Sequence, residues 1–320
     1  PFPMRLINKL ALLLLGSLCL EKSAALELRE TDETIRITDN GNTVLVYHKV
    51  EVSPPEGANP VYRRSGFVHP LCTPSGSVVT AIHPADHIHH MGLWHAWVKT
   101  VHGKRKPDFW NLKAKSGTVR YAKTLRRPKA PPGSASFTVL QEFISMDNGT
   151  APVVVLTEEF TLTVKRQGNA YLIDHTTVQK NITGTSLNLP AYRYGGPIAY
   201  RGPENWNNAN SKVMTSEGKS RANGHATRGR WCAFSGPAEK GNALVAILCH
   251  PENHDAPQRM RIWPPDSHDG AVFFNYVPIQ ETAWQLKPGK PSIMRYRLIV
   301  SDGKMDAGLI NAIWERFGKE

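Results

Sequence analysis

The stretch TIRITDNGNTVLVY, residues 34–47, decides the fold class because it has the pattern of a complete β-hairpin. Its first five residues alternate isoleucine with polar side chains, which is the period of a half-buried strand. Residues 39–42, DNGN, then contain the Asn-Gly pair that tight hairpin turns prefer. A second strand pattern returns at residues 43–47. The sequence therefore predicts antiparallel β-structure near the start of the chain.

Strand patterns recur along most of the chain. The frequent glycines (25) and prolines (24) fall between these runs, which fits many short strands joined by turns. Phe160, Leu162 and Val164 show the period of two directly. The runs are residues 136–142, 153–164, 170–180, 242–249, 270–276 and 293–300. Strands and helices do not alternate, so we expect an all-β fold: a large β-sandwich, extending to a supersandwich of two long sheets.

One late segment has helical spacing. Apolar residues recur there at intervals of three and four, after the turn residues Asp302 and Gly303. They are Met305, Leu309, Ile310, Ile313, Trp314 and Phe317. We expect this helix to cap the sheet at the C-terminus. No composition change marks a domain boundary, so residues 26–320 are predicted to form a single domain.

The N-terminal residues predict export. Arg5 and Lys9 precede a short leucine-rich run, and the small residues 23–25, SAA, follow it. This order is typical of a secretory signal peptide. We therefore predict a signal peptide at residues 1–25, with residues 1–3 as an upstream extension before Met4, and a periplasmic or extracellular protein. No later stretch is long and apolar enough to predict a membrane span.

Composition limits the partners. The chain has 40% hydrophobic and 21% charged residues, as in ordinary globular proteins, and a formal net charge of +12. The basic residues are scattered rather than arranged with aromatic residues in a stripe, which argues against nucleic acid as a partner. A basic surface suits an anionic polymer. Beyond the signal peptide, Cys72, Cys232 and Cys249 leave two readings open: one disulfide with a free thiol, or three buried thiols.

Histidines predict the working site. Seven of the 13 histidines lie between His69 and His102, most densely in residues 83–95. Neutral imidazole binds transition metals, and its charge changes near neutral pH. On an extended backbone, His87 and His89 would project from one face and His90 from the other. We predict a divalent metal site formed by His87, His89 and His250, the last at the end of an apolar strand.

Two further segments supply groups that suit a carbohydrate or another polyol. Residues 192–206 combine arginine, tyrosine, amide and carboxylate side chains. Aromatic faces stack on sugars, and the guanidinium group of arginine binds hydroxyl and carboxylate groups. Residues 108–111 could form one wall. The predicted catalytic residues are Asp86, His90, Arg193 and Glu204. The predicted substrate-binding residues are Trp94, His95, Trp110, Tyr194, Arg201 and Asn253.

Several motifs together resemble one protein family. The most specific is DHIHHMGLW at residues 86–94; the others are residues 70–76, 108–110, 229–231 with 235–236, and 250–253. In this order they resemble a bacterial family of unknown function catalogued as "methane oxygenase PmoA". The resemblance implies an exported β-sandwich protein, similar in style to carbohydrate-active proteins. A membrane methane oxygenase subunit would expose long apolar spans, which this sequence lacks.

The leading hypothesis is an exported carbohydrate-active enzyme, a hydrolase or a lyase. In it, a metal ion or His89 and His90 polarise the substrate, while Glu204 or Asp86 transfers protons. One alternative is a non-catalytic carbohydrate-binding module that uses the same aromatic and arginine side chains. The other is a copper-dependent oxidative protein. Serine hydrolase, zincin and nucleotide-binding motifs do not occur in a suitable context.

Overall fold

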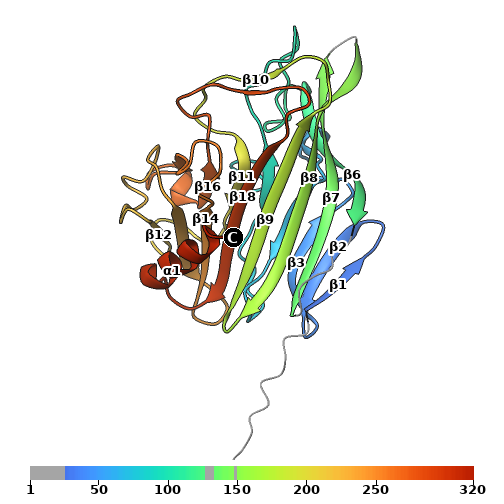
Figure 1. Ribbon diagram of the computed structural model, residues 1–320. Helices are drawn as coiled ribbons and strands as arrows, with labels where there is room; N and C mark the ends of the chain where they lie inside the picture. Colours follow the sequence, from blue (N-terminus) through green and yellow to red (C-terminus); the bar gives the residue numbers. More distant parts are fainter. Residues whose placement is uncertain (1–25, 127–132, 148–149) are drawn as a thin grey trace, which may run out of the picture.

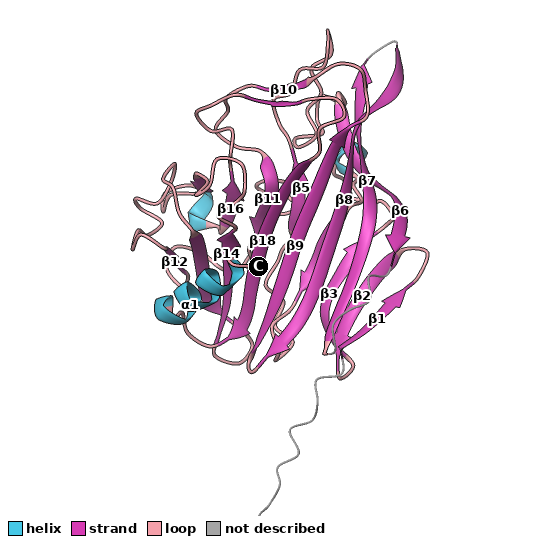
Figure 2. Ribbon diagram, in the orientation of Figure 1, coloured by secondary structure: helices cyan, strands magenta, loops and turns pink. Residues whose placement is uncertain are grey.

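The computed structural model describes residues 26–126, 133–147 and 150–320 (Figure 1). The predicted signal peptide, residues 1–25, lies outside the described residues. Two eight-stranded sheets dominate the described chain, with loops between the strands and one α-helix near the C-terminus (Figure 2). The predicted all-β sandwich with a C-terminal helix is confirmed.

The first sheet, called sheet one, is antiparallel in all its strand pairs. Its spatial order is β1 (Leu26–Glu30), β2 (Thr34–Asp39), β3 (Asn42–His48), β4 (Phe67–Leu71), β5 (Leu93–Ala96), β11 (Gly196–Arg201), β16 (Phe273–Tyr276) and β15 (Met260–Ile262). The predicted hairpin is β2 and β3. Its turn residues Asn40 and Gly41 have φ angles of 48° and 84°, the left-handed conformation that tight hairpin turns require.

The second sheet, sheet two, contains the longest strands, which lie side by side in Figure 1. Its order is β12 (Lys212–Thr215), β13 (Trp231–Pro237), β14 (Asn242–Cys249), β18 (Ser292–Asp302), β9 (Ala170–Asn181), β8 (Thr150–Gln167), β7 (Ser134–Asp147) and β6 (Gly117–Arg126). A small separate ladder joins β10 (Leu187–Leu189) to β17 (Trp284–Leu286). Two 3₁₀ turns, η1 (Pro60–Tyr62) and η2 (His268–Gly270), interrupt the loops.

Alternation along β14 shows how the layers pack. Val245 and Ile247 belong to the core between the sheets, together with Leu93 and Tyr200 of sheet one. The intervening residues of β14 point the other way. They pack under α1 (Ala307–Phe317), whose buried residues are Ile310, Ile313 and Phe317. The strand is therefore covered on both faces, and the predicted helix buries the outer face of sheet two.

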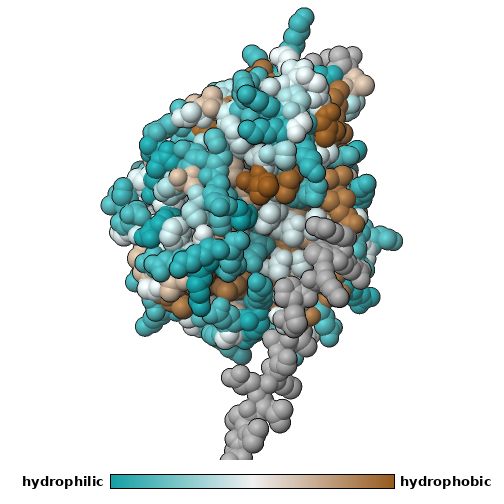
Figure 3. All heavy atoms as spheres, viewed as in Figure 1, coloured by the Kyte–Doolittle hydropathy of each residue, from teal (hydrophilic) through white to brown (hydrophobic). Residues whose placement is uncertain are grey.

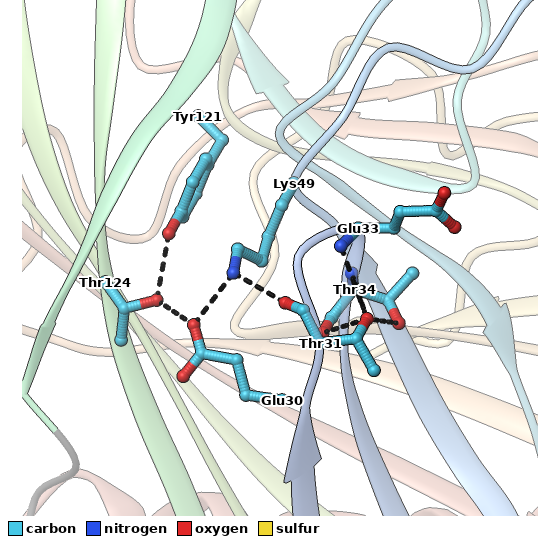
Figure 4. Close-up of polar contacts among 7 residues, drawn as sticks. All are labelled: Glu30, Thr31, Glu33, Thr34, Lys49, Tyr121 and Thr124. Atoms are coloured by element: carbon cyan, nitrogen blue, oxygen red, sulfur yellow. Dashed lines mark hydrogen bonds and ion pairs between the residues drawn. The ribbon is translucent and has the colours of Figure 1, made fainter.

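Polar contacts join the sheets along one edge (Figure 4). The Nζ of Lys49 lies 3.0 Å from Oε1 of Glu30 and donates to the carbonyl of Thr31 at 2.7 Å. The hydroxyl of Thr124, on β6, donates to the same Glu30 carboxylate and lies 3.0 Å from the hydroxyl of Tyr121. These contacts tie β1 of sheet one to the edge strand of sheet two.

A polar layer lies within the apolar core. Glu158 of β8 and His95 of β5 are fully buried, and Oε1 of Glu158 lies 2.5 Å from Nδ1 of His95. His175 of β9 is also buried, and neither of its ring nitrogens has a hydrogen-bond partner among the described residues. Its ring packs edge-on against Phe160 and Tyr296. Burial lowers the pKa of His175 to about 3.

Replacing His175 by phenylalanine is expected to reduce acid destabilisation. Because the pKa of His175 in the folded protein is about 3, the unfolded chain binds a proton there below about pH 6.5 that the folded protein does not. Stability is therefore lost as the pH falls from about 6.5 towards 3, by about 1.4 kcal/mol per pH unit at this residue. Urea unfolding at pH 7 and pH 5 should show a wild-type loss that exceeds that of His175→Phe by about 2 kcal/mol. Equal losses in both proteins would contradict this role.

The remaining predictions about the chain concern cysteines and membranes. Cys72, Cys232 and Cys249 are buried free thiols, which decides between the two readings of the sequence. Within residues 26–126, 133–147 and 150–320, no helix has the length and apolarity needed to cross a membrane.

Candidate functional site

Strand register places the candidate site on the outer face of sheet one. Residues opposite each other in antiparallel strands point to the same face. Trp94 of β5 is opposite Ala199 of β11, which is opposite Asn275 of β16, which is opposite Arg261 of β15. Their neighbours Leu93, Tyr200, Phe274 and Ile262 all point into the core between the sheets. Trp94 and Arg261 therefore share the face turned away from sheet two.

The histidine-rich segment forms consecutive turns beside this face. The amide of His87 donates to the carbonyl of Pro84 at 3.0 Å, and the amide of His90 donates to the carbonyl of His87 at 2.8 Å. The segment is therefore not extended, so the arrangement expected for His87 and His89 on an extended backbone does not apply. The turns bring three rings together, with centroid distances of 5.4 Å for His87 to His89, 4.8 Å for His87 to His90 and 4.9 Å for His89 to His90.

Gly92 fixes the segment to sheet one. Its carbonyl accepts a hydrogen bond from the amide of Arg201 at 2.8 Å, and its amide donates to the carbonyl of Ala81 at 2.9 Å. Its φ angle is +66°, and a Cβ atom would lie 2.4 Å from the carbonyl oxygen of Val68. Only glycine fits this close approach without displacement of the backbone.

Gly92→Ala is expected to destabilise the protein by at least about 2 kcal/mol, because the new methyl group overlaps a backbone oxygen and strains a left-handed residue. Chemical unfolding measures this. Gly76→Ala is the matched control, since Gly76 also has a positive φ but has open space around its Cβ position. A loss for Gly92→Ala no larger than for Gly76→Ala would show that the close approach has no energetic role.

Asp86 and Arg201 form the polar edge of the histidine cluster. Oδ1 of Asp86 accepts a hydrogen bond from Nη2 of Arg201 at 2.7 Å, and Oδ2 lies 3.5 Å from Nδ1 of His87. The guanidinium lies 5.0 Å from the ring of Trp263. Burial lowers the pKa of Arg201, while the carboxylates of Asp86 and Glu204 act in the opposite direction. Nε and Nη1 of Arg201 are buried without a partner among the described residues.

His268, which the sequence did not single out, completes this cluster. It lies in η2, where His268, Asp269 and Gly270 have φ angles of 51°, 54° and 71°. Left-handed conformations of non-glycine residues are strained and are found preferentially at functional sites. The ring of His268 lies 4.4 Å from that of His87 and 4.2 Å from Trp263. One ligand atom each of Asp86, His87 and His268 lies within 4.8 Å of the other two.

Aromatic side chains line the site next to the histidines. The ring of His90 stacks on Phe273 at 4.8 Å and lies 5.1 Å from Trp94. Trp94 lies 4.9 Å from Trp110, which lies 5.5 Å from Tyr194. The indole nitrogens of both tryptophans have no hydrogen-bond partner among the described residues. The structure thus brings the predicted wall at residues 108–111 to the histidine segment.

Burial lowers the pKa of His87, His89 and His90, which favours their uncharged form at neutral pH. Burial, together with the neighbouring charges of His87 and Arg64, lowers the pKa of His89 to about 4. Burial also lowers the pKa of His90 far below its ordinary range. The pKa of His87 is lowered by burial and by His268, against the opposing effect of Asp86. Neutral imidazoles are the form that accepts a proton or a metal ion.

A second, cationic flank lies beyond Trp110. The hydroxyl of Tyr194 donates to Asn111 at 3.1 Å, and burial raises the pKa of Tyr194 to about 12. Nη1 of Arg261 lies 3.2 Å from Nε2 of His225. Burial and the nearby charge of Arg193 lower the pKa of Arg261. Within the described part of the chain, neither Arg193 nor Arg261 forms an ion pair with a carboxylate. This flank therefore has an excess of positive charge.

His250 and Asn253 lie elsewhere, so their predicted roles at this site need correction. His250 packs edge-on against Phe317 of α1 at 5.0 Å, and its Nδ1 accepts from the amide of Glu252. The side chain of Asn253 donates from Nδ2 to the carbonyl of Arg295 and accepts at Oδ1 from the amide of Arg295, each at 2.7 Å. Both residues follow β14 of sheet two and serve the packing of its end. His250 therefore does not join the metal site predicted with His87 and His89.

The other predicted residues are divided between the interior and the surface. His95 is adjacent to Trp94 on β5 and points to the opposite face, where it contacts Glu158 in the interior. Its buried position separates it from the outer face, where the other predicted binding residues of β5 and the 108–111 segment gather. Glu204 is exposed in the loop after β11 and acts on Arg201 through its charge. Arg193 is exposed, with its guanidinium 5.5 Å from the ring of Tyr194.

These features define a class: a two-sheet β-sandwich protein with a histidine- and tryptophan-lined site on the outer face of one sheet. Residues 34–315 match the family described as "Family of unknown function (DUF6807)", and the chain belongs to this family. The prediction of a family of unknown function is confirmed, whereas its methane-oxygenase label stays a prediction. No match was found among curated proteins.

Several solved structures match the chain over most of its length. A galactose mutarotase related enzyme from Lactobacillus acidophilus matches at 10% identity and a TM-score of 0.40, covering 88% of this chain and 100% of that one. A variant of the GH36 α-galactosidase AgaA from Geobacillus stearothermophilus, in complex with stachyose, matches at 9% identity and a TM-score of 0.43, covering 88% and 41%. A galactose mutarotase-like protein from Clostridium acetobutylicum matches at 10% identity and a TM-score of 0.37, covering 88% and 100%.

Proposed function

We propose that this protein is an exported glycan lyase that cleaves an acidic carbohydrate on the outer face of sheet one, with a divalent metal ion held by Asp86, His87 and His268. The observation that carries the proposal is the convergence of these three ligand atoms within 4.8 Å of one another, beside an aromatic wall and a cationic flank.

The donor set fits a transition metal. Two imidazoles and one carboxylate leave coordination positions open for water or substrate, as in catalytic zinc and non-haem iron sites. Nδ1 of His87 is buried without a hydrogen-bond partner among the described residues. Arg201 holds one oxygen of Asp86 and leaves the other facing His87, which is the orienting contact that metal-binding carboxylates usually have. We therefore propose Asp86, His87 and His268 as the metal ligands, in place of the set predicted from the sequence, which was His87, His89 and His250.

The aromatic and cationic groups favour an acidic sugar. The partly exposed ring of Tyr194 offers a face on which an apolar sugar face can pack, and the buried Trp110 supports it from beneath. Among the described residues, Arg193 and Arg261 have no carboxylate partner, and they lie at the same flank. A uronic acid supplies both a ring to pack and a carboxylate to pair with guanidinium groups. A neutral glycan would leave these charges uncompensated.

Elimination suits these groups better than hydrolysis. Glycoside hydrolysis generally uses a pair of carboxylates on either side of the bond, and here Asp86 is engaged by Arg201. Elimination needs a base and a cation that neutralises the sugar carboxylate. When bound, the metal ion would neutralise that carboxylate and so acidify the proton on the adjacent carbon.

The residues of the chain carry the proton transfers. We assign the removal of the proton from carbon 5 of the uronate to the imidazole of His89, which is partly exposed, whereas His90 is buried. The freed electron pair forms the double bond between carbons 4 and 5, and the bond from carbon 4 to the glycosidic oxygen breaks. The leaving oxygen takes a proton from the neutral hydroxyl of Tyr194 or from water. Arg193 and Arg261 hold the substrate during these steps.

A substrate panel tests this function. The full chain is incubated with a uronate polymer, a sulfated glycan and a neutral glycan, and the ultraviolet absorbance of the new carboxylate-conjugated double bond is followed. We expect absorbance to grow with the uronate polymer only and to fall at least about tenfold in Arg193→Gln/Arg261→Gln, since two charge contacts are lost. Arg29→Gln/Arg63→Gln, at two exposed arginines elsewhere, is the matched control.

Three other outcomes would overturn the lyase assignment. New reducing ends without the absorbance would indicate hydrolysis. Binding of a glycan without any cleavage would indicate a carbohydrate-binding module. Turnover that requires copper, a reductant and oxygen would indicate oxidative cleavage.

A further inference from the structure

A separate cavity of about 750 Å³ opens at the β12 edge of sheet two. Its size lies within the range of pockets that bind small molecules. In the view of Figure 3, the side of the molecule that carries β12 is mainly hydrophilic. The charged lining residues are Lys212, Lys219, Arg221 and Lys304. None of the residues that line it is aspartate or glutamate.

The positive charges of this cavity are not compensated by nearby acids. Among the described residues, Lys212, Lys219 and Lys304 form no ion pair. The adjacent Glu217 lies 3.7 Å from Arg230 outside the cavity. The carboxylate of Asp302 accepts hydrogen bonds from the amide and the hydroxyl of Ser75. An anion inside the cavity would therefore meet several cations and no carboxylate.

Arg221 is the buried cationic side chain of the cavity. It is 5% exposed, and its guanidinium donates to Ser211 Oγ at 2.7 Å and to the carbonyl of Gly270. Burial lowers the pKa of Arg221. A buried guanidinium that has only neutral partners is costly, because its charge loses hydration without gaining a counter-ion. A bound anion would supply that counter-charge.

Neutral polar groups accompany the cations. The side chains of Asn208, Asn242 and Ser235 line the cavity and have no side-chain hydrogen bond within the described ranges. Amide and hydroxyl groups of this kind can form hydrogen bonds with the hydroxyl groups of a sugar or another polyol. Apolar side chains also line the cavity: Val213, Met214, Ala222, Pro265 and Met305.

We propose that the β12 cavity binds a small anion rich in hydroxyl groups, a uronic acid or a sugar phosphate. The cations pair with the carboxylate or phosphate, and Asn208, Asn242 and Ser235 bind the hydroxyls. The proposal does not rest on the lyase function, since no metal ligand or cationic residue of the outer face lines this cavity. The segment from Pro265 to Gly270 separates the two sites: Pro265 lines the cavity, while His268 faces the outer site.

Calorimetric titration of the full chain tests this site. The Arg193→Gln/Arg261→Gln background is used so that the outer face contributes no anion binding. The probes are trigalacturonate, glucose 6-phosphate, inorganic phosphate and a neutral trisaccharide. We expect either acidic sugar to bind more tightly than inorganic phosphate, and Lys212→Gln/Lys304→Gln to weaken it about tenfold. The matched control Lys123→Gln/Lys287→Gln removes two exposed lysines elsewhere and should leave affinity unchanged.

The probe that binds identifies the ligand class: trigalacturonate a uronic acid, glucose 6-phosphate a sugar phosphate. The absence of binding by every acidic sugar would overturn the proposal. So would equal weakening by the control pair, or equal affinity for inorganic phosphate, which would indicate an anion site without sugar recognition. Loss of binding on His87→Ala/His268→Ala instead of the lysine pair would place the ligand at the outer face.

Discussion

His87→Ala/His268→Ala is expected to remove the bound divalent metal ion and to lower glycan turnover by more than about a thousandfold. The two imidazoles provide two of the three ligand atoms that lie within 4.8 Å of one another, so a single carboxylate would remain. His268 is exposed and His87 is half-buried, so the fold should be retained. Elemental mass spectrometry gives metal content, and steady-state rates on the uronate polymer give turnover.

The matched control is His102→Ala/His254→Ala, two partly exposed histidines with other contacts. His102 bonds Thr183, and His254 stacks on Trp284. This control should keep wild-type metal content and turnover. Equal metal content in the wild type and in His87→Ala/His268→Ala would contradict the metal site. Wild-type protein without metal, even after reconstitution, would contradict it as well.

His95→Ala is expected to destabilise the protein by about 3–5 kcal/mol, because it leaves the buried carboxyl group of Glu158 without its partner. Both side chains are fully buried, and their polar atoms lie 2.5 Å apart. Urea or thermal unfolding measures the loss. The Michaelis constant of the folded fraction should not change, since His95 points away from the outer face.

The pair can be separated from simple loss of packing by a double-mutant cycle. His95→Leu/Glu158→Leu removes both polar groups at similar volume, and it should recover much of the stability lost in either single variant. A double variant that is as unstable as the sum of the singles would show that the two residues do not act as a pair. A raised Michaelis constant for folded His95→Ala would restore the predicted binding role.

The fold was largely predictable because local periodicity reports which face of an element is buried. The hairpin at residues 34–47 combines alternation with an Asn-Gly turn, and both signals are local. Residues 242–249 match β14 in full. The helix near residue 310 was predictable because its apolar residues recur at intervals of three and four positions. Neither signal reports which strands become neighbours, and the order of the two sheets was not predicted.

The candidate site was predictable only in part. Clustering in the sequence found His87, His89 and His90, and composition found Trp110 and Tyr194. His268 has no neighbouring histidine in the sequence and reaches the cluster through a left-handed turn, so no local signal marks it. His250 was misplaced because a strand end can lie at either edge of a sandwich. The interior position of His95 was predictable, since strict alternation places it opposite Trp94.

The proposed metal site of Asp86, His87 and His268 on the outer face of sheet one is tested most directly by anomalous diffraction. Crystals of the protein are measured above and below the absorption edge of the metal found by elemental analysis. We expect one strong anomalous peak within about 2.0–2.2 Å of a nitrogen of both histidines and an oxygen of Asp86. A peak at another position, or no peak with the metal supplied in excess, would contradict it.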